Sequence, residues 1–292
     1  MIKFVINSKQ NNKKIVSIIR TKYPNCSSGT IHKALRNKDI KINGQRIKED
    51  TVVFQDDEVE AFISDELLNE NDKSTSNQKI EKERILFDDD NILIYNKPQE
   101  MEVQGSKGTV GLEQLLNEKY KVKVRACHRL DRNTSGLVIF AKNDDAEKTM
   151  LSMIKDRKVK KYYRALVYGI PKNKNMTLKA YLFKDSKKSN VIISDVPKKG
   201  YQEIITKYRL LESDKESNTA TLEIELITGR THQIRAHLAH IGHPIIGDGK
   251  YGINQVNKAF KKKYQELQAY KVVFEEADGI LEYLENKEIK IK

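Results

Sequence analysis

The side chains best suited to chemistry lie together in residues 126–143, ACHRLDRNTSGLVIFAKN. Within this stretch, His128, Arg129, Asp131 and Arg132 are followed by two hydroxyl side chains and then by an apolar strand. A polar loop at the mouth of a strand is where catalytic groups usually lie. Asp131 is the only carboxylate of the stretch, which makes it the candidate for catalytic work. The alternative, from residue types alone, is a polar turn in which Asp131 caps its own loop.

Two other sets of residues offer different chemistry. Cys127 adjoins His128, but neighbouring residues of a strand point to opposite faces, so this pair is badly placed for activating a thiol nucleophile. Four histidines fall within 12 residues: His232, His237, His240 and His243. A zinc site, as in a metal-dependent hydrolase, would use such ligands. The sequence has no HExxH motif, however. We therefore expect helix packing, helix-end hydrogen bonds and phosphate contact from these histidines, and no metal.

Composition limits the class of protein. The chain has 292 residues, about twice a usual domain, which favours two domains. Its 54 Lys and Arg residues against 41 Asp and Glu residues give a net charge of +13, which favours a phosphate-bearing partner; a charge that serves only solubility is the alternative. Two cysteines, Cys26 and Cys127, provide no disulfide framework, so a cytoplasmic location is expected. The longest apolar run, 137–141, is far too short to span a membrane, and no leader opens the chain.

An acidic, polar stretch at residues 64–83 divides the chain. It ends in a Ser, Thr, Asn and Gln run and carries a charge of −3, whereas residues 1–63 carry +5 and residues 84–292 carry +11. Such a composition is typical of a solvated linker. We therefore expect two basic domains, 1–63 and 84–292, joined by the linker 64–83.

The first segment predicts two short helices followed by a hairpin. Apolar residues at helical spacing indicate a helix over 11–23, which Pro24 ends, and a second helix that begins at Ser27 or Ser28. Asn43-Gly44, between alternating apolar residues, is a strong hairpin signal. Five basic residues gather around the corner between helix and hairpin: Lys33, Arg36, Lys38, Lys41 and Arg46. The arrangement resembles the S-four RNA-binding module, named after a small-subunit ribosomal protein. That resemblance implies that these five residues bind RNA.

The second segment predicts many strands and few helices. Apolar strands are indicated around the Asp turn at 88–90, and further strands by alternating residues such as TLEIELITG. One helix is expected to begin near Asn143 or Asp144, a good capping position. Another is expected over 231–241, with Gly242 as its end and Pro244 blocking any continuation. The lysine run 258–263 is expected to be a solvated helix that adds to a phosphate-binding surface.

HRLDRNTSGL, residues 128–137, resembles the signature loop HRLDxxTSGL of pseudouridine synthases of the RluA/RluD type. Three further elements match that family in order: Asn96-Lys97-Pro98, the K-x-Y-x-A-x-V strand from Lys161 to Val167, and the closing motif at 228–252. The similarity extends over roughly 200 residues, from Ile85 to Phe274. It implies an α+β catalytic domain with a large mixed, mainly antiparallel sheet, preceded by the small αα-β domain.

The resemblance also implies a reaction and roles. The protein would isomerise uridines to pseudouridine in structured RNA, most readily large-subunit ribosomal RNA. Transfer RNA, or a non-catalytic RNA-binding or ribosome-assembly role, is the alternative. Asp131 would be the catalytic carboxylate, Arg230 its ion-pair partner, Arg129 the residue that fills the gap left by the flipped uridine, and Tyr163 the ring against the flipped base. Whether Asp131 adds to the base or takes a ribose proton stays open. No cofactor, metal or DNA partner is expected, and the chain is expected to be a monomer.

Three positions depart from the family pattern. Glu100 stands where the family usually has glycine after the Asn-Lys-Pro element. Gln104 and Gln268 each stand where many relatives have histidine. None of the three lies in the signature loop, so we expect them to affect substrate choice rather than the reaction.

Overall fold

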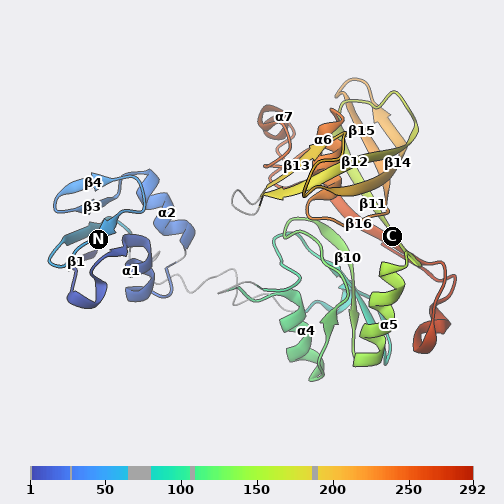
Figure 1. The fold of residues 1–292 in the computed structure, drawn as a ribbon, viewed down its shortest axis with the longest axis horizontal. Coiled ribbons are helices and arrows are strands. Elements are labelled where there is room, and N and C mark those ends of the chain that lie inside the picture. Colours follow the sequence, from blue (N-terminus) through green and yellow to red (C-terminus); the bar gives the residue numbers. More distant parts are fainter. Residues whose placement is uncertain (1, 27, 65–79, 106–108, 186–189, 292) are drawn as a thin grey trace. The chain divides into compact units, whose positions relative to one another are not determined.

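The computed structural model describes residues 2–26, 28–64, 80–105, 109–185 and 190–291. The chain forms two compact units, Met1–Gln78 and Lys79–Lys292 (Figure 1). Of the expected linker, residues 65–79 lie outside the described part of the chain. None of the helices in the described ranges is long and apolar enough to cross a membrane.

The N-terminal unit packs two helices against a small antiparallel sheet. The sheet has the order β1 (Ile2–Val5), β6 (Glu58–Ala61), β3 (Ile40–Ile42), β4 (Gln45–Ile47). Two short strands, β2 (Lys13–Lys14) and β5 (Val52–Val53), pair with each other. The apolar residues of α1 (Ile15–Lys22) and α2 (Ser28–Arg36) share one buried core with the sheet. The period of the apolar residues in each helix therefore accounts for the face that is buried.

The sequence predictions for this unit differ from the structure at one helix end. The helix expected over 11–23 begins only at Ile15, because residues 13–14 are held as a strand by residues 52–53. The hairpin is confirmed: Asn43 and Gly44 have φ of 49° and 75° and connect β3 to β4. Two positive φ values are what a type I′ turn requires, which explains the Asn-Gly pair.

The second unit is built on an eleven-stranded sheet. Its strands are β7 (Ile85–Asp88), β8 (Ile92–Lys97), β9 (Arg125–Ala126), β10 (Ser135–Ala141), β11 (Val159–Tyr168), β12 (Asn175–Asp185), β13 (Asn190–Ser194), β14 (Gln202–Asp214), β15 (Thr219–Leu226), β16 (Leu267–Phe274) and β17 (Glu288–Lys290). Nine of them follow the order β13-β12-β14-β15-β11-β16-β10-β8-β7, while β17 pairs with β16 and β9 with β10. Among the described pairs only β10 and β16 run parallel. The predicted α+β fold with a large mixed, mainly antiparallel sheet is confirmed.

The two halves of this sheet meet where β10 crosses β16. The pairing covers only two positions, Ser135 opposite Gln268 and Gly136 opposite Ala269. Gly136 has φ of 115°, and a Cβ built there would lie 2.2 Å from the carbonyl oxygen of Ala269. Only glycine tolerates both the backbone angle and the close approach. Ser135 and Gly136 of the signature loop thus make the close backbone contact that joins the two halves of the sheet.

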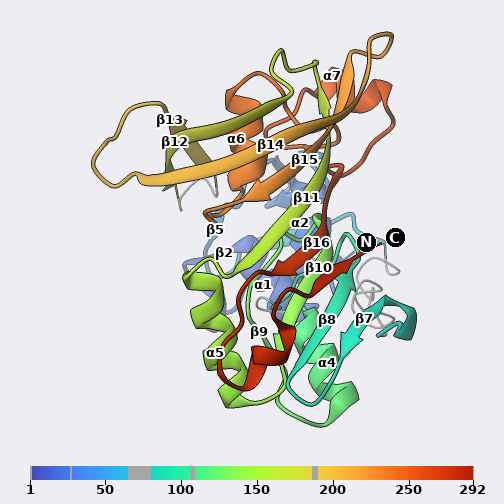
Figure 2. The same cartoon turned by 90° about the vertical axis from the view of Figure 1, so that its right-hand side faces the viewer.

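Two helices of this unit match predicted ones. α5 (Asp144–Lys155) begins as expected, since the side chain of Asn143 accepts a hydrogen bond from the Ala146 N–H at 2.8 Å. α6 (Gln233–His240) begins two residues later than expected, because His232 has left-handed backbone with φ of 53°. Figure 2 shows α6 behind β12 and β14, on one face of the sheet.

Two further helices differ from the predictions. α4 (Leu112–Tyr120) was not predicted, and its apolar face contributes Leu112 and Leu116 to the main core. α7 (Asn254–Ala259) takes up only Lys258 of the lysine run 258–263. The expectation that the whole run is helical is therefore wrong, and left-handed backbone at Lys261, with φ of 52°, turns the chain after α7.

Candidate active site

Asp131 lies in a tight turn between β9 and β10. The Thr134 N–H donates to the Asp131 carbonyl oxygen at 3.0 Å, which closes the turn over residues 132–133. The side chain of Gln265 donates to the Thr134 hydroxyl at 3.2 Å from the neighbouring β16 segment. The carboxylate itself remains 27% exposed. The loop is therefore fixed while the carboxylate stays accessible.

Lys97, the lysine of the Asn-Lys-Pro element, fixes this turn from behind. It is fully buried, and its Nζ donates to the carbonyl oxygens of Pro98 (2.9 Å), Met101 (2.8 Å) and Arg132 (3.0 Å). Burial lowers the pKa of Lys97 to about 7, while the negative charge of Asp131 acts against that shift. Three carbonyl acceptors require three N–H donors, which only the protonated ammonium provides. The bonds therefore place a cation next to the turn that carries Asp131.

A cavity of about 420 Å³ opens in front of Asp131. Among the described residues that line it, Asp131 is the one carboxylate. Four cationic side chains also line it: Arg129, Lys161, Arg230 and Arg235. An excess of positive charge around one carboxylate suits a substrate that itself carries negative charge.

Arg235, on α6, is the ion-pair partner of Asp131. Its Nη1 donates to Asp131 Oδ2 at 2.9 Å, and its Nε and Nη2 donate to the two oxygens of Asp248 at 2.6 and 2.9 Å. Burial alone would lower the pKa of Arg235, but the hydrogen bonds and charges of Asp248 and Asp131 outweigh it and raise the pKa. For Asp248, burial acts to raise the pKa, and Arg235 outweighs it. Arg235 and Asp248 are therefore held in their charged forms.

Arg230 does not take the place that the sequence suggested. The expectation that it pairs with Asp131 is wrong, because Arg235 makes that bond. Arg230 is exposed at the rim of the cavity and forms no side-chain ion pair with the described residues. Its backbone N–H donates to Gln233 Oε1 at 3.1 Å, so the loop before α6 is fixed while the guanidinium is free to meet a ligand.

His232 flanks the second oxygen of Asp131. Its Nε2 lies 3.9 Å from Asp131 Oδ1, and its Nδ1 lies 2.9 Å from the Tyr251 hydroxyl. That hydroxyl accepts the Val191 N–H at 3.2 Å, so its own proton is available to His232 Nδ1. Desolvation lowers the pKa of His232, opposed by Asp131. The arrangement keeps the imidazole neutral with its proton on Nε2, the nitrogen that faces Asp131.

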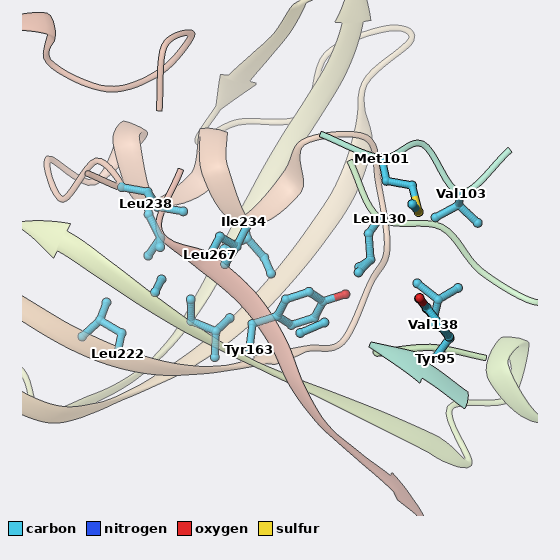
Figure 3. Packing of buried hydrophobic residues seen from close by; sticks show 14 of the residues in the cluster. Tyr95, Met101, Val103, Leu130, Val138, Tyr163, Leu222, Ile234, Leu238 and Leu267 are labelled. Atoms are coloured by element: carbon cyan, nitrogen blue, oxygen red, sulfur yellow. The ribbon is translucent and has the colours of Figure 1, made fainter. Parts of the chain in front are cut away.

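Tyr163 and Arg129 lie where the sequence placed them, at the cavity. Tyr163, on β11, is 4% exposed, and burial followed by the charge of Asp131 raises its pKa, so the phenol stays protonated. Figure 3 shows its ring below Ile234, with the hydroxyl toward Leu130. Arg129 is exposed, and its guanidinium makes no hydrogen bond or ion pair within the described ranges. Tyr163 thus provides a fixed ring and Arg129 a movable cation.

His128 opens the signature loop and acts as a half-buried acceptor. Its Nε2 accepts the Ile139 N–H at 3.1 Å, a bond that requires a neutral imidazole. Burial, followed by the nearby charge of Lys161, lowers the pKa of His128 to about 3. His128 therefore ties the loop to β10 only while it is unprotonated.

This bond predicts a loss of stability in acid. Between pH 6.5 and 3 the unfolded chain binds a proton at His128 that the folded chain does not, so the free energy of unfolding falls as pH falls. At pH 5 the loss is about 2 kcal/mol. Urea unfolding of the wild type and of His128→Gln at about pH 7 and pH 5 measures it, because the glutamine oxygen can accept the same bond without titrating. An equal pH dependence in both proteins would contradict the assignment.

The other histidines have separate partners. His237 Nδ1 lies 3.0 Å from the Thr206 hydroxyl, and His240 Nε2 lies 2.8 Å from Asp195. His243 packs beside Gly169. No group of three metal-ligating side chains occurs in the described part of the chain. The spacing that suggested a zinc site thus belongs to residues with unrelated contacts.

The five basic residues of the N-terminal unit are placed near one another by α2, β3 and β4. Lys33, Arg36 and Lys38 are exposed at and beyond the end of α2. Arg46 Nη1 donates to the Lys38 carbonyl oxygen at 3.1 Å, which brings the hairpin to the helix end. Lys41 is partly neutralised, since its Nζ lies 3.7 Å from Glu60.

Sequence reasoning missed four residues of the cavity region. Arg235, His232 and Asp248 all lie within the closing motif 228–252, and Lys161 begins the K-x-Y strand. Of these, only His232 had been considered, as a member of the histidine cluster and not as a neighbour of Asp131. Burial lowers the pKa of Lys161, which lines the cavity beside Tyr163. Their position inside matched motifs was the available signal.

Comparisons with known proteins agree with this geometry. Residues 91–240 match the family model described as RNA pseudouridylate synthase. The chain is 32% identical to a Bacillus subtilis protein named as an uncharacterized RNA pseudouridine synthase, YhcT, over 86% of this chain and 82% of that protein. It is 33% identical to the ribosomal large subunit pseudouridine synthase C of Rickettsia bellii, over 87% of each chain. The solved structure of human RNA pseudouridylate synthase domain containing 1 matches with a TM-score of 0.59 and 24% identity, over 71% of this chain and 82% of that one, which shows a shared fold.

Proposed function

This chain belongs to the RNA pseudouridylate synthase family, and from that premise we propose that it isomerises uridines of large-subunit ribosomal RNA, with Asp131 as the catalytic carboxylate. The observation that carries the role of Asp131 is its position: it is the one carboxylate among the described residues lining a cationic cavity, and it is held by Arg235 at 2.9 Å. The isomerisation breaks the bond from ribose C1′ to uracil N1, turns the base, and joins C1′ to uracil C5. C5 loses its proton when it joins C1′, and N1 gains a proton after its bond to C1′ is broken, so the net composition does not change.

We propose the following division of work in the cavity. Asp131 acts on the ribose or the base, and Arg235 orients it through the hydrogen bond to Oδ2. His232 faces Oδ1 with its N–H and limits the directions from which a substrate group can approach. Tyr163 lies against the base, and Arg129 enters the space that the flipped uridine leaves, which offsets part of the few kcal/mol that flipping costs.

The choice of large-subunit ribosomal RNA over transfer RNA is supported by relatives named as ribosomal large subunit pseudouridine synthases, one of them 32% identical over 89% of this chain. Mapping pseudouridines in total RNA from a strain that lacks the protein tests it. We expect one or a few sites in large-subunit ribosomal RNA to disappear and to return with the wild-type gene but not with Asp131→Asn. Disappearance confined to transfer RNA would assign the other substrate.

We further propose that the N-terminal unit binds RNA through its basic corner. Replacing Lys33, Arg36 and Lys38 together with glutamine in the full chain should weaken RNA binding and make its salt dependence shallower by about 0.7 to 0.9 for each phosphate that is no longer bound. Fluorescence anisotropy against potassium chloride concentration measures both. A matched control replaces Lys9, Lys13 and Lys48, which lie elsewhere in the unit. Equal salt slopes in the two variants would mean that the basic corner is an ordinary solvated surface and does not bind RNA.

We also propose that the protein works as a monomer in the cytoplasm. Asp131, Tyr163, His232 and Arg235 all come from one chain and line one cavity, so the site needs no residue from a second copy. Cys26 and Cys127 are both buried thiols, which suits a compartment where disulfides do not form. Sedimentation of the purified protein tests the oligomeric state.

A further inference from the structure

A second hollow in the catalytic unit is lined by lysines and, within the described residues, by no acid. It measures about 440 Å³ and lies around α7 and the turn before it. Its described lining consists of Gly247, Gly249, Asn254, Asn257, Lys258, Lys261, Lys262 and Lys263. The four ammonium groups are donors only, and the Asn254 and Asn257 amides add N–H donors beside their carbonyl oxygens, so the charge of this lining favours an anion.

Half of this positive charge is uncompensated. Lys262 and Lys263 reach acids outside the hollow, at 3.2 Å to Glu266 and 3.5 Å to Glu100. Lys258 and Lys261 form no ion pair with any described residue. A third hollow of similar size, about 400 Å³, gives the contrast, because its two cations pair with its two acids: Arg209 with Glu223 and Lys207 with Glu225. Of these two hollows, the lysine-lined one therefore has a net positive charge that would attract a polyanion.

The lysine-lined hollow is connected to the candidate active site on two sides. The first connection runs through Asn257, whose side chain donates to the Asp248 carbonyl oxygen at 3.0 Å. The Asp248 carboxylate in turn holds Arg235.

The second connection runs through Glu100. Lys263 lies 3.5 Å from its carboxylate, and Arg132 Nε donates to its carbonyl oxygen at 3.3 Å. Arg132 directly follows Asp131 in the chain. A strand of nucleic acid that places one nucleotide in the cavity would therefore have its neighbouring backbone within reach of the lysines.

We propose that the lysine-lined hollow binds a backbone phosphate of the RNA strand next to the target uridine. The proposal rests on the proposed function and specifies where the flanking strand binds. Each bound phosphate adds about 0.7 to 0.9 to the slope of log affinity against log salt, or roughly sixfold in affinity at 0.1 M salt relative to 1 M. Affinity and salt slope must therefore change together.

The test is RNA binding by full-length Lys258→Gln/Lys261→Gln, measured by anisotropy from about 50 to about 400 mM potassium chloride, a range over which screening of charge changes strongly. The control is Lys148→Gln/Lys155→Gln, which removes the same charge from α5. At about 0.1 M salt we expect the first variant to bind RNA about sixfold more weakly for each phosphate that it no longer holds, and its salt slope to be shallower. The control should match the wild type in both affinity and slope. Equal changes in both variants would mean a general charge effect and would overturn the proposal.

Glu100→Gln should change RNA affinity and its salt slope in the opposite direction. It removes the acid beside Lys263 and keeps the size of the residue, whose backbone is left-handed with φ of 64°. We expect tighter RNA binding and a steeper salt slope; weaker or unchanged binding would contradict the hollow as an RNA site. Repeating the titration in potassium phosphate at equal ionic strength separates RNA from free anion, since specific displacement by phosphate would assign the hollow to a free anion instead.

These outcomes are independent of the chemistry. If the wild type binds RNA but forms no pseudouridine, the proposed function fails while the binding comparison still decides the role of the hollow. If pseudouridine forms and the lysine variant binds like the control, the function stands and the hollow fails. Unfolding curves of each variant, required to overlay on wild type, show that any change in affinity comes from the surface.

Discussion

Pseudouridine formation is expected to fall by about 10⁴-fold or more in Asp131→Asn, the order seen when a catalytic nucleophile is removed. The amide keeps the size of the carboxylate but has neither its charge nor its basicity. No other described residue that lines the cavity carries a carboxylate to replace it. Single-turnover formation of pseudouridine in a substrate RNA measures the effect.

The same variant should fold and bind RNA like the wild type. Arg235 retains its two bonds to Asp248 at 2.6 and 2.9 Å when the bond to Asp131 is weakened, so no buried charge is stranded. Unfolding and RNA affinity serve as the controls. Residual activity within about tenfold of the wild type would contradict the proposal that Asp131 is the catalytic carboxylate. If Asp131→Asn proved unstable, Asp131→Ser would provide the same comparison.

Arg235→Ala has a different expected signature, because it should lose stability as well as activity. Asp248 is fully buried and would be left without its counter-charge. Breaking one side of a buried ion pair costs about 3–5 kcal/mol. For a unit of this size that corresponds to a melting temperature lower by roughly 6–20 °C. Scanning calorimetry and the pseudouridine assay measure the two losses on one preparation.

Arg230→Ala is the matched control. Both arginines line the cavity and both lie in the closing motif, but Arg230 is exposed and pairs with no described acid. Its removal should change stability by no more than about 0.5 kcal/mol. If Arg230→Ala destabilised the protein and Arg235→Ala did not, the assignment of Arg230 as the partner of Asp131 would be restored and the network around Arg235 would be wrong.

The reason that sequence selected the wrong arginine is local and physical. The motif GRTHQIR offers both residues, and a helix expected from Thr231 gives no preference for the second. In the structure His232 has left-handed backbone, so α6 begins at Gln233 and Arg235 falls on its buried side. Its second partner, Asp248, lies 13 positions further along and is brought near only by the tertiary fold. The matched family motifs pointed to Asp131 and Tyr163, and both line the cavity; their roles in the reaction stay predictions.

Backbone angles explain one departure from the family pattern. Glu100 has φ of 64°, a value that glycine adopts without cost, which accounts for glycine at this place in relatives. Here the strained residue is compensated by its side chain, which bonds the Tyr264 hydroxyl and faces Lys263. Most strands and the hairpin followed from periodicity and turn residues, and the fold class followed from the family resemblance. α4 and the lysine-lined hollow did not, since their formation depends on packing between segments distant in sequence.

The short junction between β10 and β16 has a mechanical consequence. Asp131 precedes β10 on one half of the sheet, whereas Tyr163 and Arg235 belong to the other half, and only two residue pairs join the halves at that point. Because so few backbone pairs join the two halves there, side-chain bonds that cross the junction also hold them in alignment: Arg235 to Asp131 at 2.9 Å and Gln265 to Thr134 at 3.2 Å. We expect an RNA that contacts both halves to add further bonds across this junction and so to help hold Asp131 against its partners.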